Sequence, residues 1–249
     1  MRVVICLLSF LFFSLYSFGQ WRLSAKLIAS NQQVTDKYFS AVPFSGIHYG
    51  VAASAQFTKN NNLHEWETGF STGSIETHTN PAASGKQSLF AFNYYNLYKV
   101  SPGNTSPWTI RAGGSINVLY AKRSYDDFIN NNTSGEFAAS LSAAAEATVD
   151  FGEALPGLSL SDQLTVPFVS ALAQPAFGEK LSGGSVFSNM QAGSFSSFLR
   201  IKNKLALDKK ITDNQSISLS YIWDYYRFTT DRRVYQAGHK LALQYSFTL

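Results

Sequence analysis

The chain has 249 residues and a net charge of +4, with 14% charged and 15% aromatic residues. A polytopic helical membrane protein would need repeated apolar runs of about 20 residues, and a disordered chain would have few aromatic residues, so both classes are excluded. Soluble globular domains carry about 25% charged residues, so the composition favours an aromatic-rich all-β protein.

The first segment, residues 1–19, has the form of a secretory signal peptide. A basic start precedes an uncharged apolar run over residues 3–18, and Ser17-Phe18-Gly19 places small residues at a cleavage site. Cleavage would leave a mature chain that begins at Gln20 and lacks the only cysteine, Cys6, and therefore has no disulfide. A membrane anchor is the alternative, but the apolar run is shorter than about 20 residues.

Beyond this segment, apolar and polar residues alternate in long rows, which predicts β-strands with one apolar face. In chain order the rows lie near 21–27, 47–57, 63–73, 88–99, 108–120, 137–151, 158–173, 195–208, 217–225 and 241–249. Most strands are expected to exceed the ordinary length of about 5–6 residues, and about 9–11 residues cross a bilayer. We expect an all-β fold, a closed antiparallel up-and-down transmembrane β-barrel of about ten strands, with 8 or 12 strands as alternatives.

The connections between the rows alternate in length. Long polar connections are expected at 31–46, 74–87, 122–136 and 174–194, and short ones at 58–62, 101–107, 152–157 and 209–215. The last connection, near 229–234, is short where a long one is due. Because outer-membrane barrels have short periplasmic turns and longer external loops, residues 20–249 are predicted to form a barrel in a bacterial outer membrane.

Aromatic residues gather near the ends of the apolar rows, with aliphatic residues between them. The residues concerned are Trp21, Phe57, Trp108, Tyr120, Phe137, Phe151, Tyr235 and Phe247. Such aromatic girdles flank the lipid-facing band of membrane barrels. A soluble lipocalin-like barrel or sandwich also alternates, but its apolar rows would face inward.

The C-terminal part, residues 155–249, resembles a family of outer-membrane β-barrels of unknown function found in Bacteroidota. The resemblance is carried by Leu164-Thr-Val-Pro167-Phe-Val, Gln174-Pro175-Ala-Phe177-Gly178, Phe198-Leu-Arg-Ile-Lys-Asn-Lys-Leu-Ala-Leu and Ser218-Leu-Ser-Tyr-Ile-Trp-Asp-Tyr-Tyr. The Tyr usual in the family after Gln-Pro is replaced here by Phe177, and Glu-Lys-Leu-Ser follows Gly178. The resemblance implies an outer-membrane barrel and no known chemistry.

If the apolar rows face lipid, the opposite rows line the lumen with charges of both signs. The inward charges are Arg22, Lys26, Glu65, Glu67, Arg111, Glu146, Asp150, Arg200, Lys202, Lys204, Asp224 and Lys240. Unpaired charges in such an interior are costly, so ion pairs are expected. A hairpin around 122–136 sets Arg111 opposite Glu146, and a turn near residue 232 sets Asp224 opposite Lys240.

Catalytic chemistry has few candidates in this sequence. His48 is predicted to point into the lumen, and His239 toward lipid, where a lipid hydrolase would place its base. Ser188-Asn189 has no histidine near it in sequence, His78 lies in a predicted loop, and Asp126-Asp127 fits a solvated loop tip. We therefore expect no catalytic, metal or cofactor site, with a lipid-acting hydrolase of the phospholipase or lipid A deacylase type as the alternative.

The expected role is that of an outer-membrane barrel with a structural, binding or narrow-pore function. Wide aqueous channels need about 16 strands, whereas barrels of about 8 strands are filled by their own side chains. The expected partners are outer-membrane lipid, lipopolysaccharide and, through the C-terminal strand, the barrel-assembly machinery. No basic cluster indicates nucleic acid.

Overall fold

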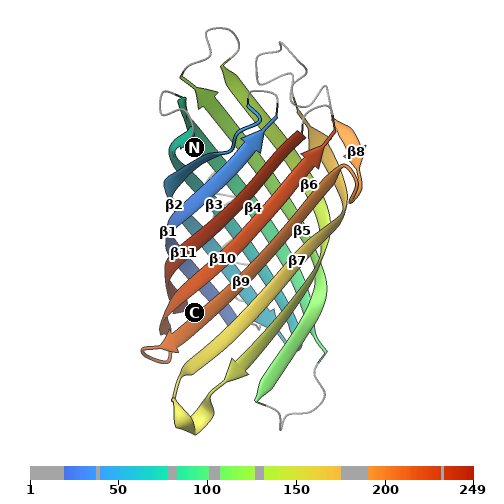
Figure 1. Cartoon of the computed structure of the whole chain (residues 1–249). Coiled ribbons are helices and arrows are strands. Elements are labelled where there is room, and N and C mark those ends of the chain that lie inside the picture. Colours follow the sequence, from blue (N-terminus) through green and yellow to red (C-terminus); the bar gives the residue numbers. More distant parts are fainter. Residues whose placement is uncertain are drawn as a thin grey trace, which may run out of the picture.

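The computed structural model describes residues 20–37, 40–77, 83–100, 107–126, 132–174, 190–230 and 233–249. The predicted signal peptide and the motifs at Ser188-Asn189, His78 and 175–178 lie outside these ranges. Ten long strands form a closed antiparallel barrel (Figure 1). Their bounds are β1 Gln20–Asp36, β2 Phe44–Lys59, β3 Asn62–Thr77, β4 Ser84–Lys99, β5 Trp108–Tyr125, β6 Thr133–Asp150, β7 Leu158–Ala173, β9 Phe198–Lys210, β10 Gln215–Thr229 and β11 Arg233–Thr248.

Each long strand pairs with its neighbours in the chain, and the first strand closes on the last. The order is β6-β5-β4-β3-β2-β1-β11-β10-β9-β7, and β7 returns to β6. A short strand, β8 (Gln191–Gly193), adds to β7, and a single helical turn, η1 (Gly152–Ala154), follows β6. The up-and-down all-β topology is confirmed, and the alternatives with 8 or 12 strands are wrong. No helix in the described ranges is long and apolar enough to cross a membrane.

The two ends of the barrel differ in their connections. At the loop end, uppermost in Figure 1, the strands are joined through 37–43, 78–83, 126–132, 174–197 and 230–232. At the turn end the strands are joined through 60–61, 100–107, 151–157, which contains η1, and 211–214, and β1 begins and β11 ends there. The predicted alternation of long and short connections is therefore wrong, because only 174–197 is longer than every connection at the other end, and this segment defines the loop end.

The strands run further toward the loop end than the sequence pattern predicts. They contain 13 to 18 residues, and β5 and β6 take up most of the predicted connection 122–136. At this end the outward positions are polar as well, as at Lys122 and Ser124, so the apolar–polar alternation that marks a strand disappears. Three of the predicted long connections, 31–46, 74–87 and 122–136, were therefore too long, whereas 174–194 extends to residue 197.

The apolar rows face outward around the whole barrel. Leu27, Tyr49 and Leu243 are 65%, 67% and 53% exposed, whereas Lys26 is 3% exposed and points inward. A soluble barrel would bury such leucines and expose such a lysine. The alternative of a soluble barrel or sandwich with inward-facing apolar rows is therefore wrong.

A charge placed in the middle of the outward face should destabilise the barrel in a bilayer. We expect Leu27→Arg to lower the free energy of unfolding by about 2–4 kcal/mol, because arginine is costly at the bilayer midplane. Gln33→Arg, on the same face of β1 but near the loop end, should cost about 0–1 kcal/mol. Urea titration of protein refolded into lipid vesicles measures both values, and equal costs would place neither residue at the midplane.

Candidate functional site

The lumen is closed at the loop end by an apolar cluster. We call this cluster the loop-end plug, and its buried members are Val34, Phe44, Ile75, Leu119, Tyr125, Ala138, Leu172, Phe198, Tyr226, Phe228 and Val234. Ring centroids lie 4.8 Å apart for Phe198 and Phe228 and 5.0 Å apart for Phe44 and Tyr125. Side chains from all of the long strands except β4 thus meet across the lumen and leave little room for water.

A buried polar network lies against the plug and ties five strands together. Arg123 donates from Nη1 to Glu136 Oε2 at 2.7 Å, and from Nη2 to the Tyr226 hydroxyl at 2.8 Å and Gln236 Oε1 at 2.9 Å. The Tyr226 hydroxyl donates to Glu136 Oε1 at 2.8 Å, and Gln236 Nε2 donates to Gln32 Oε1 at 2.9 Å. Since Arg123 and Glu136 are 0% and 2% exposed, this pair is a fully desolvated ion pair.

The Arg123–Glu136 pair was not predicted, because both residues fell within the predicted connection 122–136. A signal was nevertheless present. Arg123 continues the inward row of Arg111 along β5, and Glu136 continues that of Glu146 along β6, each at an even spacing. Extending the rows by parity would have placed both charges in the lumen.

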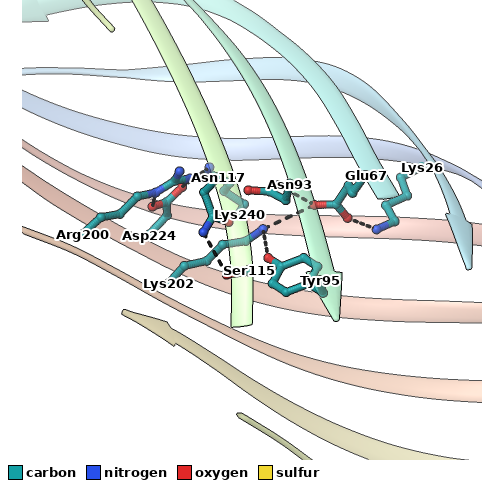
Figure 2. Close-up of polar contacts among 10 residues, drawn as sticks. All are labelled: Lys26, Glu67, Asn93, Tyr95, Ser115, Asn117, Arg200, Lys202, Asp224 and Lys240. Atoms are coloured by element: carbon teal, nitrogen blue, oxygen red, sulfur yellow. Dashed lines mark hydrogen bonds and ion pairs between the residues drawn. The ribbon is translucent and has the colours of Figure 1, made fainter. Parts of the chain in front are cut away.

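In the middle of the lumen, Asp224 is held by two cations (Figure 2). Arg200 donates from Nε and Nη2 to the two Asp224 carboxylate oxygens, each at 2.9 Å, and Lys240 Nζ donates to Oδ2 at 2.8 Å. Asp224 was predicted to stand directly opposite Lys240, but it stands opposite Gly238, and Lys240 stands opposite Ile222. The register is shifted by two residues, so both faces are kept and Lys240 reaches Asp224 on the diagonal.

Glu67 forms the second centre of this middle layer (Figure 2). It pairs with Lys26, and its Oε1 accepts from Lys202 Nζ at 3.3 Å and from Asn93 Nδ2 at 3.3 Å. Lys202 also lies 3.4 Å from the Tyr95 hydroxyl, so it crosses the lumen from β9 to β3 and β4. The cavity remaining in this layer measures about 70 Å³.

Toward the turn end the lumen widens into two adjoining polar cavities of about 220 Å³ each. We call them together the vestibule. The outer cavity reaches the turn residues Gly157 and Thr212, and both cavities are lined by Arg22 and Asp208. The inner cavity has six charged lining residues: Arg22, Glu65, Arg111, Glu146, Lys204 and Asp208.

Two ion pairs lie on the vestibule wall. Arg111 Nη1 is 2.8 Å from Glu146 Oε1, between residues that stand directly opposite each other in β5 and β6. Arg22 Nη2 is 2.8 Å from Asp208 Oδ1 and donates to Ser216 Oγ at 2.7 Å. Asp150, predicted to face the lumen, is instead exposed at the turn end and accepts the Gly152 backbone N–H at 2.9 Å.

Mutation of the Arg111–Glu146 pair should show coupling between the two residues. We expect Glu146→Ala to weaken folding and Arg111→Ala, added to it, to restore part of the loss, with a coupling energy of about 0.5–3 kcal/mol. A double-mutant cycle of unfolding free energies in vesicles measures this value. If the two single losses simply add, the residues do not act as partners.

Neither candidate histidine is arranged for hydrolysis. His48 is 0% exposed, faces the lumen, and makes no hydrogen bond to Ser30, its register partner in β1. His239 is on the outward face, and its Nδ1 lies 2.6 Å from the Tyr221 hydroxyl. Among the described residues we find no hydrogen-bonded Ser–His pair and no group of three His, Cys, Asp or Glu side chains suited to a metal ion.

No protein-family model and no curated protein matches the chain. Solved structures do match it. Outer membrane protease OmpT from Escherichia coli has a TM-score of 0.53 at 4% identity, covering 94% of this chain and 98% of that chain. The translocator domain of autotransporter NalP from Neisseria meningitidis has a TM-score of 0.48 at 10% identity, covering 93% of this chain and 89% of that chain. The likeness to OmpT shows that the chain has an outer-membrane β-barrel fold.

Proposed function

We propose that the protein is a bacterial outer-membrane barrel that works as a binding protein, sealed toward the cell exterior and open toward the periplasm. The observation that carries this proposal is the graded lumen. It narrows from a vestibule with cavities of about 220 Å³, through a middle layer of about 70 Å³, to the buried loop-end plug. Its polar, charge-lined space is therefore at the turn end.

The outer membrane is favoured as its location by the outward apolar face and by the fold shared with OmpT. The predicted signal peptide and the resemblance of residues 155–249 to the Bacteroidota barrel family support the same location. Lipid and lipopolysaccharide would contact the outward leucines and aromatic residues. The last strand, which ends at Phe247-Thr-Leu249, would be the segment recognised by the barrel-assembly machinery.

A binding role is favoured over that of an open pore, because the plug and the Arg123 network lie across the conduction path. A hydrolase is not favoured by any arrangement among the described residues, since neither His48 nor His239 is hydrogen-bonded to a serine. A barrel blocked at one end can still admit a small solute from the other. The vestibule is therefore the candidate binding site.

Conductance in planar lipid bilayers tests this proposal. The wild-type barrel should give no stepwise current, whereas a triple variant that empties the plug, Phe44→Ala with Phe198→Ala and Phe228→Ala, should give small steps. Phe247→Ala, which removes an outward aromatic ring, is the matched control and should stay silent. Stable wild-type steps that the plug substitutions do not change would overturn the sealed-barrel proposal.

A further inference from the structure

Two vestibule residues, Glu65 and Lys204, stand apart from the other inward charges. In the middle layer and on the vestibule wall, the other described charges have partners at hydrogen-bond distance, as in Arg111–Glu146 and Arg22–Asp208. Glu65 is 9% exposed and Lys204 is half-buried, yet neither makes a hydrogen bond or ion pair with a described residue. Both line the inner cavity of the vestibule.

The two side chains face each other across the lumen. Glu65 comes from β3 and Lys204 from β9, strands separated by β2, β1, β11 and β10 on one side and by β4, β5, β6 and β7 on the other. Two residues closer to the loop end, the same strands supply Glu67 and Lys202, which do touch, with Nζ and Oε1 3.3 Å apart. The widening of the lumen therefore leaves an anion and a cation separated by open polar space.

Glu65 and Lys204 have opposite charges but no hydrogen-bonded partner, and Glu65 has little contact with solvent, so this gap favours a molecule that supplies a hydrogen-bonded counter-charge to each. An ammonium group would bind the Glu65 carboxylate, and a carboxylate would bind the Lys204 ammonium, in charge-assisted hydrogen bonds. A free anion such as phosphate would satisfy Lys204 and leave Glu65 facing it. A free amine would bind Glu65 and leave Lys204 without a counter-charge.

The remainder of the inner cavity fits the same class of ligand. Its other charges cancel within the Arg111–Glu146 and Arg22–Asp208 pairs, so the wall as a whole carries no net charge. Hydroxyl and amide side chains complete the lining, including Ser24, Ser54, Gln56, Ser161, Ser218 and Gln244. These groups both donate and accept hydrogen bonds.

We propose that the vestibule binds a small zwitterion of amino-acid or dipeptide type, with its ammonium on Glu65 and its carboxylate on Lys204. The two adjoining cavities of about 220 Å³ each give room in the range of small-molecule sites, about 300–1,000 Å³. Entry is through the outer cavity at Gly157 and Thr212. The inference rests on the proposed function only for the statement that this opening faces the periplasm.

Calorimetric titration of the full mature barrel in detergent micelles tests the site, with diglycine, acetate and methylammonium as probes. Diglycine should bind at least tenfold more tightly than either singly charged probe. Glu65→Gln and Lys204→Met should each weaken diglycine at least tenfold. The exchanged variant, Glu65→Lys with Lys204→Glu, should recover binding because the ligand can reverse its direction. Glu76→Gln, on the same strand as Glu65 but exposed, is the matched control and should change nothing.

The three probes are compared on the wild-type barrel, so the proposal can be refuted even if a variant fails to fold. Absence of diglycine binding at millimolar concentration, equal binding of the three probes, or unchanged affinity in folded Glu65→Gln and Lys204→Met would each overturn it. A silent bilayer without diglycine binding contradicts the zwitterion site alone. Stepwise wild-type current with diglycine binding contradicts the sealed barrel alone.

Discussion

Replacing either Arg123 or Glu136 by alanine should cost the barrel about 3–5 kcal/mol of unfolding free energy, because each change leaves the other charge buried without its partner. The Arg123 guanidinium is 0% exposed and also bonds Tyr226 and Gln236, so its loss frees several buried acceptors at once. Glu136 is 2% exposed, so without Arg123 its carboxylate would have almost no contact with water.

Urea titration in lipid vesicles measures this effect. The double variant Arg123→Met with Glu136→Leu serves as the control, because it removes both charges and keeps much of the volume. It should be more stable than either alanine variant, since replacing a buried pair by apolar groups is often neutral. Single losses below about 1 kcal/mol would show that the pair is hydrated and that the loop end is not sealed.

The second large effect is expected at Asp224. Asp224→Asn should cost about 3–5 kcal/mol, because Arg200 and Lys240 would then face each other without an anion between them. Lys240→Met should cost less, since Arg200 keeps its two bonds to the Asp224 carboxylate, each at 2.9 Å. The same vesicle titration ranks the two variants. Equal costs would indicate that Arg200 does not hold Asp224 as the structure shows.

The parts of the lumen that the sequence could predict depend on one hairpin at a time. Arg111 and Glu146 could be matched because the connection between β5 and β6 fixes the register of every pair along those strands. The Asp224–Lys240 pair was predicted with a shifted register, since the length of the turn near 229–234 decides it. In both hairpins the alternation of side chains between the two faces of a strand correctly placed the charges inward. A register shift of two residues does not change which face a side chain is on.

What the sequence could not predict depends on barrel closure. Phe44, Phe198 and Phe228 come from strands far apart in the chain, and only the closed barrel brings them into one plug. Glu65 and Lys204 were both expected to face the lumen, but no local register relates β3 to β9 across it. Strand pairing relates only residues of neighbouring strands, so it cannot predict contacts across the lumen.

The most direct test of the central claim is cysteine accessibility in intact bacteria. The only cysteine, Cys6, lies in the predicted signal peptide, so a single cysteine can be placed at Asn132 at the loop end or at Asn61 at the turn end, both exposed. A membrane-impermeant maleimide should label Asn132→Cys on whole cells and Asn61→Cys only after lysis. Labelling in the opposite order, or recovery of either variant in the soluble fraction, would contradict a barrel that is sealed toward the exterior and open toward the periplasm.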